Sequence, residues 1–295
     1  MRNLDAHEDY KVDSQMLAGS LRQLAGDFTQ PQEEYPAPYG VVGFGEGWWP
    51  AELAHLWVPR LMTEGGTQFV LKGGLDLGAA AGAAAAAEAS GARVVLVGFG
   101  GEVDVPIGPH PLSPYRYLRF LQEATGESET GRRVDEALAT LAGRLDTSVP
   151  TEDNPAKFFA WNLIERMPVW VVSERYAGLA QALQQSFARI AGSLSIAPPP
   201  GNLEFFITAL ESRHEQGDPL AAVVVGSDEK TKLAVEILET RVDTVLELPE
   251  PPAAGLIPEM MAAWYFSVWT AYYLAILYGR DPADAAVLKR LREEA

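Results

Sequence analysis

Short apolar segments alternate with helical patterns along almost the whole chain, and this alternation is the feature that most limits the possible fold. Continuous apolar runs are typical of strands buried on both faces, as they are in parallel sheets. Helices that connect parallel strands cover both faces of such sheets. The sequence therefore predicts an α/β protein with three layers, built on doubly wound parallel sheets. We expect strands over Tyr39 to Phe44, Gln68 to Leu71, Ala92 to Gly98, Val103 to Ile107, Val169 to Ser173, Ser193 to Ala197, Leu220 to Val225 and Asp243 to Leu248.

The order of elements occurs twice. The first strands of the two halves begin near residues 41 and 169, and the third strands near 93 and 221, so both offsets are about 128 residues. The polar stretch from Asp146 to Pro155 is the expected linker between the halves. We expect an N-terminal subdomain over 1–150, a second subdomain over 151–255, and C-terminal helices over 256–295 that pack back on the first subdomain.

Composition excludes several classes of function. The formal net charge of −17 argues against a protein that binds nucleic acid or an anionic membrane surface, because such proteins need clustered basic residues. Cys is absent and His occurs four times, so we expect no metal site and no thiolate nucleophile. The first ten residues are polar and show no signal peptide, and the apolar stretch from Gly255 to Tyr278 is interpreted as a buried helix rather than a membrane span. We expect a cytoplasmic protein.

Glycine-rich turns follow three of the predicted strands, at the sheet edge where ligands of such folds bind. The first is Gly43-Phe44-Gly45-Glu46-Gly47, whose glycines favour either contact with a ligand or tight turn geometry. The second contains Lys72, Gly73 and Gly74, where Lys72 offers a positive charge and Asp76 offers a helix cap. The third runs from Gly98 to Glu102. Glu46 is unusual in such a turn, because a carboxylate repels phosphate.

Two arginines on the following helix, Arg116 and the competing Arg119, are candidates for contact with an anion, and a solvated surface position is the alternative for each. At the end of the first strand of the second half, Ser173-Glu174-Arg175-Tyr176 favours either a ligand contact or a salt bridge.

Together, the order of elements and the glycine turns of this chain resemble those of the bifunctional phosphoglucose/phosphomannose isomerase family, a branch of the sugar isomerase (SIS) domain proteins. The resemblance depends on the glycine turn after the first strand, the duplicated half and the tail G-L-I-P-E-M-M … Y-G-R-D-P … L-K-R-L. It implies two SIS-like subdomains, a homodimer, no cofactor, and a sugar or sugar phosphate as the ligand. The family interconverts aldose and ketose phosphates with a His that opens the ring and a Glu that moves a proton between C1 and C2.

Most of the family's catalytic and phosphate-binding side chains are replaced at the matching positions of this sequence. Glu46 and Gly47 stand where the family has Gly and Ser, and the second turn lacks the family's hydroxyl cluster. Ser186 stands where the family has its catalytic Glu, and no His occurs near Asn202. An Arg near the family position (Arg116) and the tail lysine (Lys289) remain.

Two hypotheses follow. Either the chain is an active isomerase with relocated acid–base groups, for which Glu204, Glu174 and His110 are the catalytic candidates, or it is a non-catalytic member that binds a sugar or another metabolite, or serves as a structural dimer. In both cases we expect the ligand to contact residues of the turns and of the positions carried over from the family, namely Gly43, Gly45, Glu46, Gly47, Lys72, Gly73, Gly74, Arg116, Ser186 and Lys289.

Overall fold

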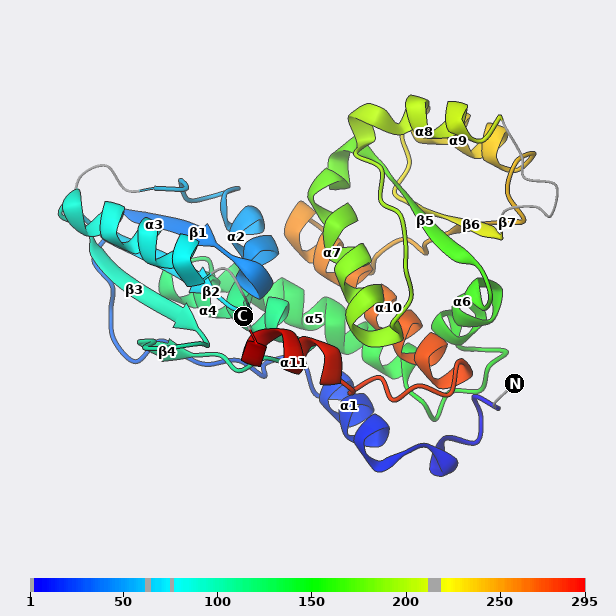
Figure 1. The fold of residues 1–295 in the computed structure, drawn as a ribbon, viewed down its shortest axis with the longest axis horizontal. Helices are drawn as coiled ribbons and strands as arrows, with labels where there is room; N and C mark the ends of the chain where they lie inside the picture. The colour runs from blue at the N-terminus through cyan, green and yellow to red at the C-terminus, as the bar shows by residue number, and fades with distance from the viewer. Residues whose placement is uncertain (1–2, 62–64, 75–76, 212–218, 295) are drawn as a thin grey trace. The chain divides into compact units, whose positions relative to one another are not determined.

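The computed structural model describes residues 3–61, 65–74, 77–211 and 219–294 and contains two parallel β-sheets with helices on both faces (Figure 1). The predicted α/β fold is confirmed. The first sheet has the order β1-β2-β3-β4 and the second has the order β5-β6-β7. The strands are β1 Tyr39–Gly43, β2 Thr67–Lys72, β3 Arg93–Gly98, β4 Val105–Pro106, β5 Met167–Val172, β6 Leu220–Val225 and β7 Thr244–Glu247.

The helices of the first sheet are α2 Trp48–Ala54, α3 Leu77–Ala89 and α4 Ser113–Ala124. Because side chains alternate along a strand, Val41, Phe69 and Val95 lie on one face of this sheet, in one core cluster with residues of α2 and α4. On the other face, Val94 packs against Ala87 of α3. The sheet is therefore the middle of three layers.

The second sheet is covered in the same way. Apolar residues on one face of this sheet, such as Val169 and Val171, pack with Leu203 and Ala234. Leu203 belongs to helix α8 (Leu203–Ala209), and Ala234 belongs to helix α9 (Glu229–Leu238). On the opposite face, the ring of Trp170 makes an edge contact with Phe187 at 4.8 Å. The remaining α-helices are α1 Val12–Arg22, α5 Ser128–Leu145, α6 Pro155–Leu163, α7 Ala180–Ser186, α10 Leu256–Leu277 and α11 Ala286–Glu294.

The second sheet has fewer strands than the sequence predicts. The segment Ser193 to Ala197 is not a strand of a ladder, and it makes one isolated bridge between Ile196 and Val169. Two backbone bonds hold it there, from Trp170 N to Ile196 O and from Ile196 N to Pro168 O. Three consecutive prolines follow from residue 198, and proline has no N–H to extend the ladder.

The sequence pattern also predicts helices over 9–28, 50–62, 77–89 and 177–191. Three of them differ from the structure in their ends. The first predicted helix, 9–28, is shorter in the structure (α1), and the helix expected over 50–62 begins earlier and ends at Ala54. The helix expected over 177–191 is divided into a 3₁₀ segment Glu174–Leu179, the α-helix α7 and a π-helical turn Phe187–Ala191 that ends at Gly192 with φ of 62°.

Contacts group the chain into two compact units. One contains Met1–Ala25 and Glu136–Asp284, and the other contains Gly26–Asp135 and Ala285–Ala295. Thus α10 belongs to the unit of the second sheet, and α11 belongs to the unit of the first. The division at residues 150 and 255 remains a prediction.

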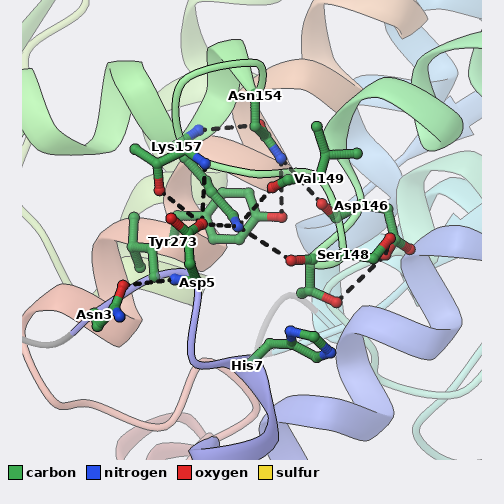
Figure 2. Close-up of polar contacts among 12 residues, drawn as sticks. Asn3, Asp5, His7, Asp146, Ser148, Val149, Asn154, Lys157 and Tyr273 are labelled. Carbon is green, nitrogen blue, oxygen red and sulfur yellow. Dashed lines mark hydrogen bonds and ion pairs between the residues drawn. The ribbon is translucent and has the colours of Figure 1, made fainter.

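The expected linker, Asp146 to Pro155, is an ordered part of the unit that contains the second sheet. The fully buried Lys157 donates from Nζ to Asp5 Oδ1 at 2.8 Å and to the carbonyls of Thr147 and Val149 at 3.1 and 2.7 Å (Figure 2). The Asn154 side chain caps α6. This segment is therefore held by side chains that its polar composition alone does not reveal.

The longest helix, α10, is long and apolar enough to cross a membrane, but its most apolar 18 residues are entirely buried inside the protein. It packs against α6 and α7. The predicted buried helix is confirmed, and its composition is that of a core helix.

Candidate functional site

The first glycine turn leaves β1 at Gly43, forms a 3₁₀ turn over Gly45–Gly47 and enters α2. Two of its amides donate to carbonyls of β2 and of the second glycine turn. Phe44 N donates to Leu71 O at 2.9 Å, and Glu46 N donates to Gly73 O at 3.1 Å. These two N–H groups are therefore already satisfied by backbone carbonyls, and an anion at this turn has to compete with them.

The glycines of this turn are required by the same close approach. A Cβ added to Gly45, which has φ of 58°, would lie 1.5 Å from the Gly73 carbonyl oxygen. A Cβ added to Gly47 would lie 2.6 Å from the Leu71 Cβ. Gly47 is the position where the family resemblance places a Ser, so the backbone here does not accept that side chain without moving.

The third glycine turn joins the other two around the backbone of Lys72. Tyr117 Oη donates to Lys72 O at 2.8 Å, and Phe99 N donates to the same oxygen at 3.2 Å. The Lys72 side chain is 8% exposed, and its ammonium donates to Glu102 O at 2.6 Å. The three turns form one packed cluster, which we call the glycine-turn cluster (residues 43–47, 72–74 and 98–102). Asp76, the expected helix cap, lies outside the described residues.

Glu46 is the acidic residue of the first glycine turn and is paired with an arginine from α11. Arg292 Nη2 lies 2.6 Å from Glu46 Oε1, and the two side chains are 22% and 21% exposed. The Arg292 guanidinium also lies over the Phe99 ring, 4.8 Å from its centroid. Burial raises the pKa of Tyr117, and the charge of Glu46 raises it further, whereas Arg292 opposes this effect.

The second oxygen of the same carboxylate, Glu46 Oε2, is buried and has no hydrogen-bond partner in the part of the chain that the structure describes. A buried carboxylate oxygen without a donor is energetically unfavourable. Glu46 is therefore only half satisfied by Arg292.

The two candidate arginines of α4 are both engaged within the protein. Arg116 pairs with Asp27 at 2.7 Å and is 24% exposed. Arg119 is 4% exposed and lies between Asp135 at 3.1 Å and Glu123 at 2.9 Å. Arg119 thus stabilises the packing of its helix, whereas Arg116 lies near the surface.

The candidate His110 forms part of the turn that begins α4. Its Nδ1 accepts from Leu112 N at 3.2 Å, and its own amide donates to Ser113 Oγ at 3.0 Å. These bonds give His110 a structural role in the turn.

Ser186, which stands where the family resemblance places a Glu, is buried at the end of α7. Its hydroxyl donates to Ala182 O at 2.9 Å and accepts from Trp264 Nε1 at 3.0 Å. The side chain therefore serves the packing of α7 against α10.

The carboxylate candidates in the unit that contains the second sheet lie at the surface. Glu174 follows β5, is exposed, and donates from its backbone N to Asp228 Oδ2 at 3.1 Å. The next residue, Arg175, forms a salt bridge with Glu259 at 2.7 Å, which is the second of the two expectations for the S-E-R-Y segment. Glu204 is exposed in the first turn of α8.

The last candidate residue from the sequence is the tail lysine, Lys289. Lys289 is exposed on α11. The sequence does not indicate Arg292 or Tyr117, which interact with Glu46 in the structure. Arg292 lies 246 residues after Glu46 in a basic tail of ordinary appearance, and no local spacing links the two. Among the described residues there is no cluster of three or more His, Asp or Glu side chains that would hold a metal ion.

Comparisons with known proteins identify relatives of both halves. The model of the phosphoglucose isomerase N-terminal domain matches residues 17–126, and the model of the bacterial phospho-glucose isomerase C-terminal SIS domain matches residues 152–294. No curated protein matches the chain.

One solved structure is similar over the whole length. A glucose-6-phosphate isomerase like protein from Thermus thermophilus is 50% identical, with 100% of both chains covered and a TM-score of 0.92. A glucose-6-phosphate isomerase from Chlamydia trachomatis is 12% identical, with 96% of this chain and 72% of that chain covered and a TM-score of 0.61. A glucosamine-6-phosphate deaminase from Thermotoga maritima is 14% identical, with 93% and 96% covered and a TM-score of 0.59. The last two share the fold.

Proposed function

This chain belongs to the bacterial phosphoglucose isomerase family, and on that premise we propose that it is a non-isomerising member that binds a sugar or a sugar phosphate. One observation carries the proposal. The carboxylate of Glu46 lies in the first glycine turn, where the family resemblance places the phosphate subsite, and Arg292 is its counter-ion.

Electrostatics supports this conclusion. Two like charges about 4 Å apart repel by about 4 kcal/mol at an intermediate effective dielectric constant. A phosphate at this turn meets Glu46, and it finds the amides of Phe44 and Glu46 bonded to backbone carbonyls. No serine or threonine is present in either of the first two turns to replace those donors.

The missing base supports the same conclusion. In the family, a Glu transfers the proton, and a positioned base contributes on the order of 10² to 10⁴ in rate. Ser186 at the corresponding place has no titratable group at neutral pH, and it is bonded to Ala182 and Trp264.

The alternative is an active isomerase whose acid–base groups have moved to Glu204, Glu174 or His110. One observation favours it, namely the isomerase-like description of the relative that is 50% identical. By resemblance to the family we also propose a cytoplasmic homodimer without a cofactor, whose ligand binds near positions carried over from the family, which include Arg116 and Lys289.

A coupled assay separates the two functions. Glucose 6-phosphate or mannose 6-phosphate is incubated with the purified full-length protein, and formation of fructose 6-phosphate is followed. We expect no turnover above the rate without protein, together with a thermal shift caused by at least one hexose or hexose phosphate. Turnover that disappears in Glu204→Gln or His110→Ala would establish the alternative, and the absence of any thermal shift would exclude a sugar as the ligand.

A further inference from the structure

The guanidinium of Arg292 is a binding group for anions, and in this structure it is paired with the carboxylate of Glu46. It reaches the glycine-turn cluster from α11 and contacts two turns at once, with an ion pair to Glu46 in the first and a ring contact to Phe99 in the third. Lys72 is the other cation in the cluster, but its ammonium is buried against Glu102 O. Of these two cations, Arg292 is therefore the more exposed, with 22% of its side chain accessible.

The ion pair between Glu46 and Arg292 is incompletely satisfied. Only Oε1 of the carboxylate meets the guanidinium, while Oε2 is buried without a partner in the described part of the chain. A guanidinium binds a carboxylate or phosphate best in a two-point contact. A phosphate group, which has three oxygens and more charge, satisfies Arg292 better than the present one-point contact does.

We propose that Glu46 is an internal anion that closes the phosphate subsite, and that a phosphate-bearing ligand binds there only by taking Arg292 from Glu46. This inference rests on the proposed function for its class of ligand. The contact is autoinhibitory because the carboxylate both repels the ligand and holds the cation that the ligand needs. Binding is coupled to α11, since Arg292 belongs to that helix.

Two contacts fix Glu46 in its turn. Glu46 is fixed at its backbone by the bond to Gly73 O and at its side chain by Arg292. Replacing its carboxylate by an amide of the same shape leaves the backbone bond in place and removes the competing charge.

The test measures binding of inorganic phosphate and of fructose 6-phosphate to the full-length protein by isothermal titration calorimetry. Wild type is compared with Glu46→Gln, Arg292→Gln and the double variant. We expect Glu46→Gln to bind both probes on the order of five- to tenfold more tightly than wild type, because a partly exposed ion pair no longer competes. The double variant is expected to lose this gain.

Matched controls separate the pair from general charge. Glu88→Gln removes one negative charge from an exposed position of α3, and Arg290→Gln removes one positive charge from an exposed position of α11. Neither is expected to change phosphate binding by more than about twofold. Circular dichroism of each variant shows that it is folded.

Two results would overturn the inference. One is a Glu46→Gln variant that is folded and binds phosphate no more tightly than wild type, and the other is a gain that persists in the double variant. Isomerase turnover by wild type would instead contradict the proposed function and leave the binding comparison intact, so the two failures are distinguishable.

Discussion

Arg292 of α11 and Glu46 of the first glycine turn form an ion pair of 2.6 Å that brings the end of the chain onto the carboxyl edge of the first sheet. The contact joins two elements that are 246 residues apart in one compact unit. This pair places a carboxylate of the protein in the first glycine turn, where we propose the phosphate subsite. The packing of the turns, the environment of Ser186 and the pairing of the buried charges can each be tested by substitution.

Gly45→Ala is expected to destabilise the protein by about 3 kcal/mol or more. The new Cβ would lie 1.5 Å from Gly73 O, and the backbone has φ of 58°. Gly82→Ala in α3 is the matched control, because its Cβ meets nothing within 4 Å and a helical Gly→Ala change stabilises by roughly 0.5–1 kcal/mol. Chemical denaturation of both variants measures the difference. Equal effects would show that the turns are not packed as described.

Ser186→Glu, which introduces the carboxylate of the family base, is expected to lower stability without producing isomerase activity. The position is 8% exposed, and a charge buried there has no counter-ion within its present contacts, Ala182 O and Trp264 Nε1. Ser186→Ala serves as the control and costs only about 1 kcal/mol for the lost hydrogen bonds. Thermal unfolding and the coupled assay give the two readouts. Measurable turnover by the Glu variant would contradict the described environment of Ser186.

Arg119→Met is expected to cost about 3 kcal/mol or more, whereas Arg116→Met costs less than about 1 kcal/mol. Arg119 is 4% exposed between Asp135 and Glu123, so its loss leaves carboxylates without their counter-ion. Arg116 makes one partly exposed pair with Asp27. Chemical denaturation of the two variants measures the loss of unfolding free energy. A larger loss for Arg116→Met than for Arg119→Met would show that Arg119 is not the structural arginine of α4.

Stability is expected to fall in acid partly through Asp146. Burial raises the pKa of this carboxyl, but hydrogen bonds from Arg22 and Ser148 outweigh burial and hold the pKa below its ordinary value. A carboxyl with a lowered pKa in the folded state stabilises the protein above its unfolded pKa of about 3.9 and loses that contribution as the pH falls through the folded value. Thermal unfolding of wild type and Asp146→Asn between about pH 7 and pH 3 tests this. The variant is expected to be less stable at neutral pH and to lose less on acidification, and parallel curves would refute the assignment.

Much of the fold was predictable because its strands are continuous apolar runs. β6 and α3 have the predicted bounds, since the first is purely apolar between polar turns and the second is rich in Ala and ends before Ser90-Gly91. Residues 193–197 were predicted as a strand and form a single bridge. Pattern alone does not show how far a ladder extends when prolines follow it.

The candidate site was predictable only in part. The turns and the unusual charge of Glu46 are visible in the sequence because they are local features. The partner of Glu46 is not, because Arg292 is brought to it by tertiary packing and resembles any solvated residue of a terminal helix. The same is true of the segment after Asp146, which has the composition of a linker and is held by the buried Lys157 (Figure 2).

Proton exchange at C2 of glucose 6-phosphate reports directly on whether the protein has an isomerase base. Glucose 6-phosphate is incubated in D₂O with a stoichiometric amount of wild-type protein, and the C2 proton is followed by ¹H NMR, which detects base chemistry even when net turnover is slow. We expect the C2 proton signal to remain at the level of a sample without protein. Deuterium incorporation at C2 that is lost in Glu204→Gln or Glu174→Gln would contradict it and would show that this chain is an active isomerase with a relocated base.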